Sequence, residues 1–189
     1  MKKIVSLSWL LAAMLIAGSA FAQASFGVKG SFNMFNLAQK DADGDKIENK
    51  MIPAFDAGVF AEIPLADEFA LRPELLFATK GAKTKSTDVK IPLSYVELPI
   101  LFLYKGGLSN GKVLLGFGPY VGFGVAGDKF KDDIFKPFDF GGKIMAGYEF
   151  GSGISMAINA SNGLVDIEKA DLDSSTKNVG FGLTLGYRF

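Results

Sequence analysis

The 189-residue sequence contains no histidine and no cysteine. Without histidine, a Ser-His-Asp triad and any hydrolase or acyltransferase site that depends on an imidazole base are excluded. Without cysteine, thiol nucleophiles, disulfides and a cysteine-linked lipid anchor are excluded as well. We therefore predict a protein that is not an enzyme and that carries no cofactor.

All-oxygen metal sites remain open to such a sequence, and the acidic run that contains Asp41, Asp43 and Asp45 is the candidate. An EF-hand counted from Asp41 needs glycine at its sixth position and glutamate at its twelfth. The sequence has Lys46 and Ile52 there. We therefore predict no metal site and interpret the run as a solvated loop.

Long hydrophobic runs are also lacking, apart from one at the amino terminus. Lys2 and Lys3 precede an apolar segment at residues 4–17, and the small-residue sequence Ala20-Phe21-Ala22 follows it. This order is typical of a secretory signal peptide. We predict a signal peptide at residues 1–22 and one domain at residues 23–189, with no membrane-spanning helix, which would need about 20 apolar residues.

Net charge is small. The chain has 20 basic and 20 acidic residues, so removal of Lys2 and Lys3 leaves 18 against 20, a net charge of −2. A nucleic-acid-binding protein normally carries a basic surface. We therefore exclude nucleic acid as a partner.

What the sequence does have is alternation. In residues 179–189 every second side chain is large and apolar, and those between are glycine, threonine or arginine. Such a period of two is typical of a β-strand with one apolar face. The pattern recurs, and we predict eight strands, at residues 25–36, 53–63, 69–80, 91–104, 112–125, 138–150, 154–162 and 179–189.

The segments between these strands alternate in length: long, short, long, short, long, short, long. Hairpins of this kind place all long loops at one end of a barrel and all tight turns at the other. The predicted fold class is therefore all-β, an eight-stranded antiparallel up-and-down transmembrane β-barrel.

Alternation does not by itself say which face meets lipid, because a soluble carrier barrel has the same period with the opposite facing. The apolar faces of the predicted strands carry no charge, whereas the other faces carry both signs. We therefore predict that the apolar faces meet lipid and that a charge network fills the lumen. Its predicted members are Lys29, Asp56, Glu62, Arg72, Glu74, Lys80, Glu97, Lys112, Asp139, Lys143, Glu149 and Arg188.

Within this set, Glu74 and Glu97 could serve as an acid-base pair, but Arg72 on the same face favours an ionic network instead. Pro73, Pro99 and Pro119 lie inside predicted strands. Because proline cannot donate a ladder hydrogen bond, we expect bulges or frayed pairing beside them.

Several short motifs carry a family resemblance, and they occur in order along the chain. They are Phe26-Gly27-Val28-Lys29-Gly30, Arg72-Pro73-Glu74-Leu75, Tyr95-Val96-Glu97-Leu98-Pro99-Ile100-Leu101, Gly118-Pro119-Tyr120, Gly147-Tyr148-Glu149-Phe150 and Gly186-Tyr187-Arg188-Phe189. With the signal peptide, they resemble the porin-like outer-membrane β-barrel domain family, similar in architecture to OmpX-like small barrels.

The resemblance implies a location in the outer membrane of the cell envelope, with outer-membrane lipid around the barrel. It also implies insertion by the barrel assembly machinery, which in such proteins reads the last strand. The residues that match this assembly signal are Phe181, Leu183, Leu185, Tyr187 and Phe189. The word porin in the family's name does not imply a pore here.

Three functions remain open from the sequence. The first is a structural or interaction protein whose extracellular loops meet an unknown extracellular partner. The second is a narrow porin-like conduit for small solutes or ions, and the third is a soluble carrier barrel.

Overall fold

The computed structural model describes residues 23–40, 45–84, 89–131, 134–169 and 175–189. The predicted signal peptide at residues 1–22 lies outside this part of the chain, as do Asp41 and Asp43 of the acidic run.

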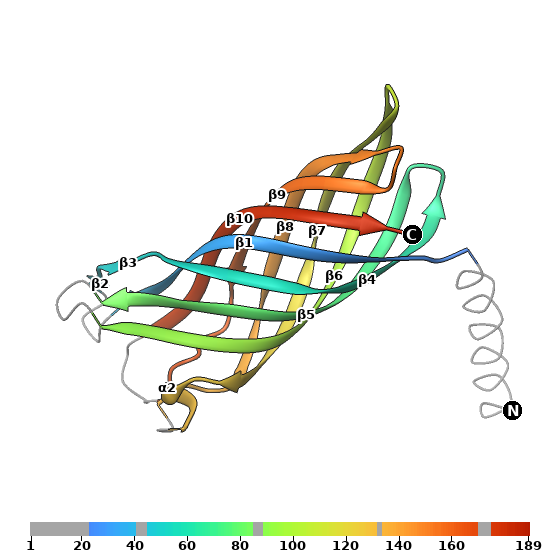
Figure 1. Cartoon of the computed structure of the whole chain (residues 1–189). Coiled ribbons are helices and arrows are strands. Elements are labelled where there is room, and N and C mark those ends of the chain that lie inside the picture. The colour runs from blue at the N-terminus through green and yellow to red at the C-terminus, as the bar shows by residue number, and fades with distance from the viewer. Residues whose placement is uncertain (1–22, 41–44, 85–88, 132–133, 170–174) are drawn as a thin grey trace, which may run out of the picture.

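Eight long strands form one closed antiparallel barrel (Figure 1). Each strand pairs with its neighbour in the chain, and the last strand pairs with the first, which closes the barrel. The predicted fold class is confirmed. The strands are β1 (Ser25–Lys40), β4 (Ile52–Ala66), β5 (Phe69–Thr84), β6 (Lys90–Leu108), β7 (Gly111–Ala126), β8 (Phe138–Phe150), β9 (Ile154–Gly163) and β10 (Ser175–Arg188).

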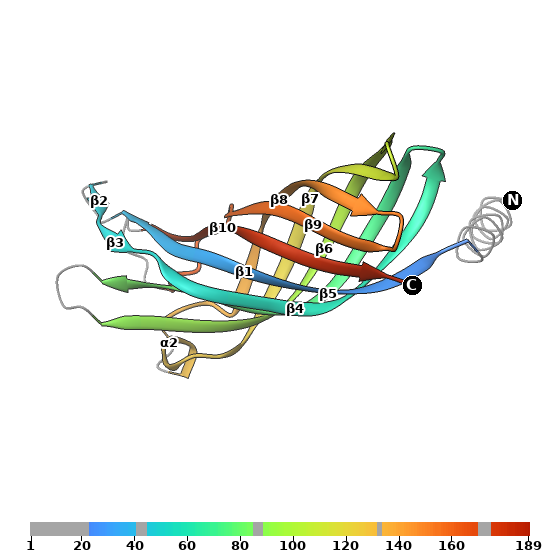
Figure 2. The same cartoon turned by 45° about the horizontal axis from the view of Figure 1, so that its top comes forward.

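Tight turns gather at one end of the barrel and the longer connections at the other, here called the turn end and the loop end (Figure 2). The carboxyl terminus lies at the turn end. There Gly153, in the turn between β8 and β9, has a φ of 85°, which glycine adopts without steric cost. Its N–H donates to the carbonyl of Phe150 over 2.9 Å.

At the loop end the structure differs from the prediction, because several strands continue beyond the apolar pattern. The predicted loop at residues 37–52 contains the end of β1 and two short strands, β2 (Lys46–Ile47) and β3 (Asn49–Lys50). These extensions mix polar residues with a few apolar ones such as Leu37 and Ala82, so they lack the regular apolar outer face that the prediction relied on. The helix α2 (Asp128–Lys131) is a single turn, and no helix in the described ranges is long and apolar enough to cross a membrane.

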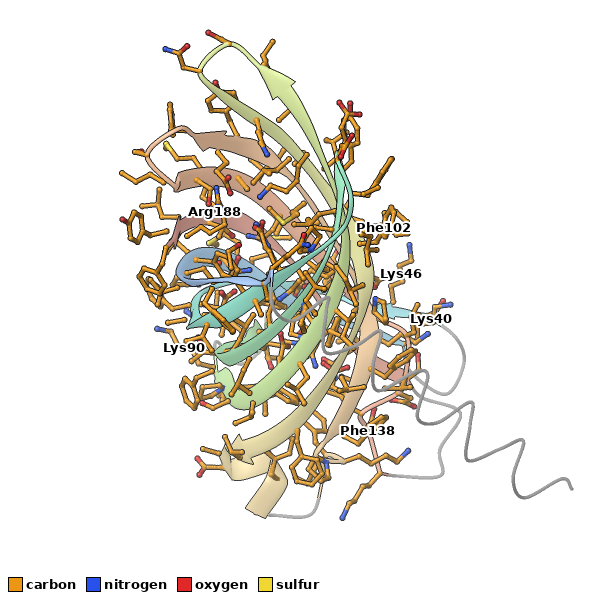
Figure 3. The ribbon with its side chains drawn as sticks, turned by 90° about the vertical axis from the view of Figure 1, so that its right-hand side faces the viewer. Lys40, Lys46, Lys90, Phe102, Phe138 and Arg188 are labelled. Carbon is orange, nitrogen blue, oxygen red and sulfur yellow. The ribbon has the colours of Figure 1, made fainter. Side chains whose placement is uncertain are left out.

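The apolar faces of the strands point outward and the charged faces point inward, as predicted. Leu183 is 62% exposed on the outside, whereas Glu97 is 1% exposed in the interior. Side chains crowd both sides of the wall in Figure 3, where Phe102 and Phe138 are labelled. A soluble carrier barrel requires the opposite facing, so this alternative is excluded.

Aromatic side chains form contacts around the turn end. Phe69 stacks on Phe102 with ring centroids 5.5 Å apart, and Tyr187 meets Phe189 edge-on at 5.5 Å. Aromatic girdles of this kind mark the membrane interfaces of outer-membrane barrels.

Pro73, Pro99 and Pro119 interrupt pairing without shifting register. Between β5 and β6 the paired residues run from Pro73 opposite Ile100 directly to Leu76 opposite Glu97, so two pairs are missing beside Pro99. Two pairs are missing beside Pro119 between β6 and β7 in the same way. The expected frayed pairing is present at these positions, whereas the irregularities of register lie elsewhere, at residues 64–66 and 94–95.

Candidate functional site

The lumen is the candidate site, and its loop-side part is centred on Lys80. The Nζ atom of Lys80 lies 2.9 Å from Oδ2 of Asp139 and also pairs with Glu97. The same ammonium lies 4.4 Å from the centroid of the Tyr120 ring. Asn178 donates to Oδ2 of Asp139 over 2.9 Å. A buried cation therefore contacts two carboxylates and an aromatic face, while Oδ1 of Asp139 is buried without a hydrogen-bond partner in the described part of the chain.

The middle of the lumen holds two further ion pairs. Lys29 lies 2.9 Å from Glu74, and Lys143 lies 3.3 Å from the second oxygen of Glu97. Each pair joins two strands that are separated by one other strand in the barrel.

Asp56, on β4 between the strands of Lys29 and Glu74, is held by neutral donors. Its carboxylate accepts hydrogen bonds from the hydroxyl of Ser31 over 2.7 Å and from the amide of Asn33 over 2.8 Å. The Ser31 hydroxyl also meets that of Thr184 at 2.9 Å. A buried carboxylate with such donors keeps the hydrogen bonds that it would make to water.

The turn-side part is a five-membered ionic cluster. Glu62 pairs with both Arg72 and Lys105. Lys105 lies 3.3 Å from Glu149, which pairs with Arg188 at 2.8 Å. These five side chains occupy the lumen near the turn end.

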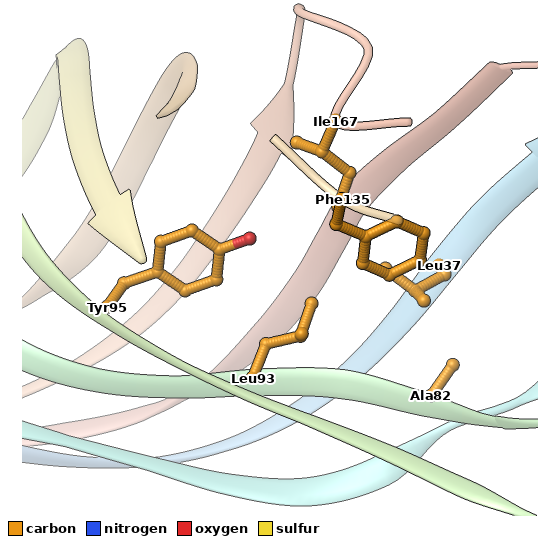
Figure 4. Packing of buried hydrophobic residues seen from close by; sticks show 6 residues of the cluster. All are labelled: Leu37, Ala82, Leu93, Tyr95, Phe135 and Ile167. Atoms are coloured by element: carbon orange, nitrogen blue, oxygen red, sulfur yellow. The ribbon is translucent and has the colours of Figure 1, made fainter. Parts of the chain in front are cut away.

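A cluster of buried apolar side chains, here called the apolar cap, lies inside the barrel toward the loop end (Figure 4). It is defined by six buried residues, which are Leu37, Ala82, Leu93, Tyr95, Phe135 and Ile167. The last two come from the connections between strands, and the N–H of Lys136 ties these connections together by donating to the carbonyl of Ile167 over 2.6 Å. The cap is therefore made by four strand side chains and by two from the connections between strands.

The turn end is more open. A pocket of about 230 Å³ lies there, lined among others by Glu62, Lys105, Lys112 and Arg188. It reaches the turn-side cluster, whose side chains form its inner wall.

Most of the predicted lumen residues lie inside the barrel. Nine are buried, namely Asp56, Glu62, Arg72, Glu74, Lys80, Glu97, Asp139, Lys143 and Glu149. The side chains of Lys29 and Arg188 are 6% and 30% exposed, and each takes part in an ion pair. Arg72, expected beside Glu74 and Glu97, pairs instead with Glu62.

Two lysines near the turn end correct the prediction. Lys112 was predicted in the lumen network, but its side chain is exposed at the turn-end pocket because β7 begins there. Lys105 was predicted in a connection, but it is buried in β6 and pairs with two glutamates. The inward alternation of Leu101 and Leu103 continues to Lys105 and would have identified it.

The residues of the predicted assembly signal all lie on the outer face of β10 or at its end. Phe181, Leu183, Leu185, Tyr187 and Phe189 are each at least 44% exposed. The outer face of this strand is thus continuous and apolar.

Metal binding and acid-base catalysis are the other chemistries considered for the lumen. The described part of the chain holds no group of three or more acidic side chains placed to bind a metal ion. Glu74 and Glu97 pair with Lys29, Lys80 and Lys143 rather than with each other.

A family model described as the outer membrane protein beta-barrel domain matches residues 21–169. The chain belongs to this family. It is therefore a protein of the outer membrane, as its outward apolar belt requires. No curated protein sequence matches the chain significantly.

Two solved structures share the fold at low identity. The outer membrane protein OprG from Pseudomonas aeruginosa has a TM-score of 0.56 and 14% identity, over 88% of this chain and 96% of that one. Neisserial surface protein A (NspA) has a TM-score of 0.52 and 12% identity, over 88% of this chain and 99% of that one.

Proposed function

We propose that this protein is a non-enzymatic structural or interaction protein of the outer membrane, which displays its loop-end segments to an extracellular partner. The observation that carries the proposal is the filled lumen. Lys80, Glu97 and Asp139 are at most 2% exposed, Lys80 pairs with both carboxylates, and the apolar cap lies nearby at Tyr95. A solute that crossed the barrel would have to break these ion pairs, which are costly to separate in a low-dielectric interior.

The loop end supports a role in binding. The short strands β2 and β3 extend the wall beyond the apolar belt, where Asn49 donates to Gln39 over 2.6 Å. Gln39 in turn donates to Thr176 over 3.0 Å. Hydrogen bonds of this kind hold a polar surface in a fixed shape above the membrane, and rigidly held loops are common binding elements.

A narrow conduit for small solutes or ions is the second candidate, and the turn-end pocket favours it, because it brings solvent to the edge of the turn-side cluster. Conduction would require the cluster around Lys80 and the apolar cap to open.

Insertion by the barrel assembly machinery belongs to the same proposal. The support is the apolar, aromatic outer face of β10, which ends in Phe189, 69% exposed. The segment at residues 1–22 would direct export and be removed.

Conductance of the purified, refolded protein in a planar lipid bilayer tests the choice between the two candidates. The structural or interaction proposal expects no steady channels from folded, inserted protein. Steady channels that change in size or ion selectivity in the Arg72→Ala and Glu74→Ala variants would overturn it and favour the conduit.

A further inference from the structure

Gln23 follows directly after the predicted signal peptide at residues 1–22. The small-residue sequence Ala20-Phe21-Ala22 ends at this point, and a signal peptidase cuts after such a sequence. Cleavage there would make glutamine the first residue of the exported chain. Glutamine is special in this position, because its side-chain amide can react with its own α-amino group.

Gln23 lies at the turn end of the barrel, just outside the paired wall. β1 begins at Ser25, whose partner on β4 is Glu62. On the other side of β1, the N–H of Phe189 donates to the carbonyl of Phe26 over 2.8 Å. The start of β1 and the carboxyl terminus lie at the same end of the barrel in Figure 1. Both ladders of β1 therefore begin after Gln23, and neither has to open for a reaction at this residue.

The side chain of Gln23 is exposed, and it lines the turn-end pocket. Three acidic and three basic side chains line the same pocket: Glu62, Asp67, Glu68, Lys105, Lys112 and Arg188. Because these charges balance, the α-ammonium group that cleavage creates would give the pocket one excess positive charge. A reaction that makes this group neutral restores the balance.

We propose that Gln23 is a modification site, at which the amino-terminal glutamine of the exported chain closes to a pyroglutamyl ring. The proposal rests on the proposed removal of residues 1–22 during export.

The reaction takes place within one residue. The neutral α-amino nitrogen of Gln23 attacks Cδ of the side-chain amide, and the new C–N bond closes a five-membered ring. The bond between Cδ and Nε2 breaks, and Nε2 leaves as ammonia with a proton from the attacking amine. No oxidant, reductant or second reactant is needed. Ring closure is efficient because the two reacting groups are held close together in the same side chain and backbone unit.

The modification would protect the strand that closes the barrel. The ring has no free α-amine, so aminopeptidases that require one cannot shorten the chain from this end. Only Gln23 and Ala24 precede β1, whose pairing with β10 closes the barrel. The ring also removes the terminal positive charge, as other modifications of a chain terminus do.

Mass spectrometry of the mature protein tests the proposal. The full chain, with residues 1–22, is produced in a bacterium that has an outer membrane, and the protein is purified from that membrane. Part of the sample is kept at neutral pH until its mass no longer changes. We expect a chain of residues 23–189 that is lighter than the unmodified chain by the mass of one ammonia molecule. Tandem mass spectrometry of the amino-terminal peptide should locate the loss at Gln23.

Gln23→Asn is the matched control. Asparagine keeps the amide, but its side chain is one methylene shorter, so the same reaction would need a strained four-membered ring. The mature variant should keep its full mass, and an aminopeptidase should release its first residue. The parent should resist the same aminopeptidase.

Two results would overturn the proposal in different ways. A mature chain that begins at Gln23 and keeps its full mass after the incubation would exclude the ring but leave export and cleavage intact. A chain that keeps residues 1–22, or that begins at another residue, would contradict the proposed cleavage as well. The amino-terminal peptide of the parent decides between these results even if the variant is not exported.

Discussion

Lys80 on β5 and Asp139 on β8 are separated by 59 positions in the sequence, yet their charged atoms lie 2.9 Å apart across the lumen. Both side chains are at most 2% exposed. This contact joins two strands that are separated by β6 and β7, and it fills the lumen near the apolar cap.

Removing the cation from this contact should be costly. Lys80→Met leaves Glu97 and Asp139 buried without their common partner, and we expect a loss of about 3 to 5 kcal/mol in the free energy of unfolding. Urea unfolding of the protein in detergent micelles measures the loss. Lys46→Met, at an exposed lysine, is the control and should change the free energy by less than about 0.5 kcal/mol. Equal stability of the two variants would show that the Lys80 cluster does not support the fold.

The facing of β10 can be tested at its centre. Leu183 is 62% exposed on the outer face, so Leu183→Arg places a charge in the lipid and should lower stability by about 2 to 4 kcal/mol. Leu65→Arg, at an exposed leucine near the turn end, should cost no more than about 1 kcal/mol. The free energies of unfolding of the two variants are measured in lipid vesicles and compared. If Leu183→Arg lowers the stability no more than Leu65→Arg does, the lipid-facing assignment of Leu183 is contradicted.

Substitution by alanine should change stability differently at glycines on the two sides of the barrel wall. A Cβ atom at Gly182 would lie 2.2 Å from both the Phe32 carbonyl oxygen and the Asn33 side chain, whereas one at Gly142 would meet nothing within 4 Å. We expect Gly182→Ala to cost about 1 to 3 kcal/mol, because the backbone of β1 would have to move. Gly142→Ala should be close to neutral. Unfolding midpoints measured side by side distinguish the two, and a neutral Gly182→Ala would contradict the close contact between β10 and β1.

The apolar cap should be separable from the barrel beneath it. Phe135→Ala removes a buried ring, which typically costs about 3 to 5 kcal/mol in local packing. We expect faster hydrogen exchange at the N–H of Lys136, which bonds to the Ile167 carbonyl, with little change at the central strand residues. Hydrogen-exchange mass spectrometry measures the exchange of peptides that contain Lys136 and of peptides from the central parts of the strands. Unchanged exchange at Lys136 would mean that Phe135 does not hold the cap together.

Much of the fold could be predicted from the sequence, because each strand carries its own period of two. The outer residues of β10, such as Leu183 and Leu185, show which face meets lipid without knowledge of any neighbour. The family predicted from the short sequence motifs is confirmed by the domain model that matches the chain.

The partners inside the lumen could not be predicted in the same way. Which cation meets which carboxylate depends on the register of all eight strands, so Arg72 was expected near Glu74 but pairs with Glu62. Lys105 was overlooked because glycines follow it, and Lys112 was misplaced because the alternation does not show where a strand leaves the membrane. The strands β2 and β3 are only two residues long, which is too short to show a hydrophobic pattern.

The filled lumen is the central claim of this account, and thiol labelling tests it most directly, because the chain has no cysteine of its own. Ala78 faces the lumen and is 3% exposed, whereas Ala66 is exposed at the turn end. Each is changed to cysteine, and the folded protein in lipid vesicles is treated with a water-soluble thiol reagent. We expect rapid labelling of Ala66→Cys and protection of Ala78→Cys until the protein is unfolded. Labelling of both at similar rates in folded protein would show a continuous aqueous path in the barrel and contradict the claim.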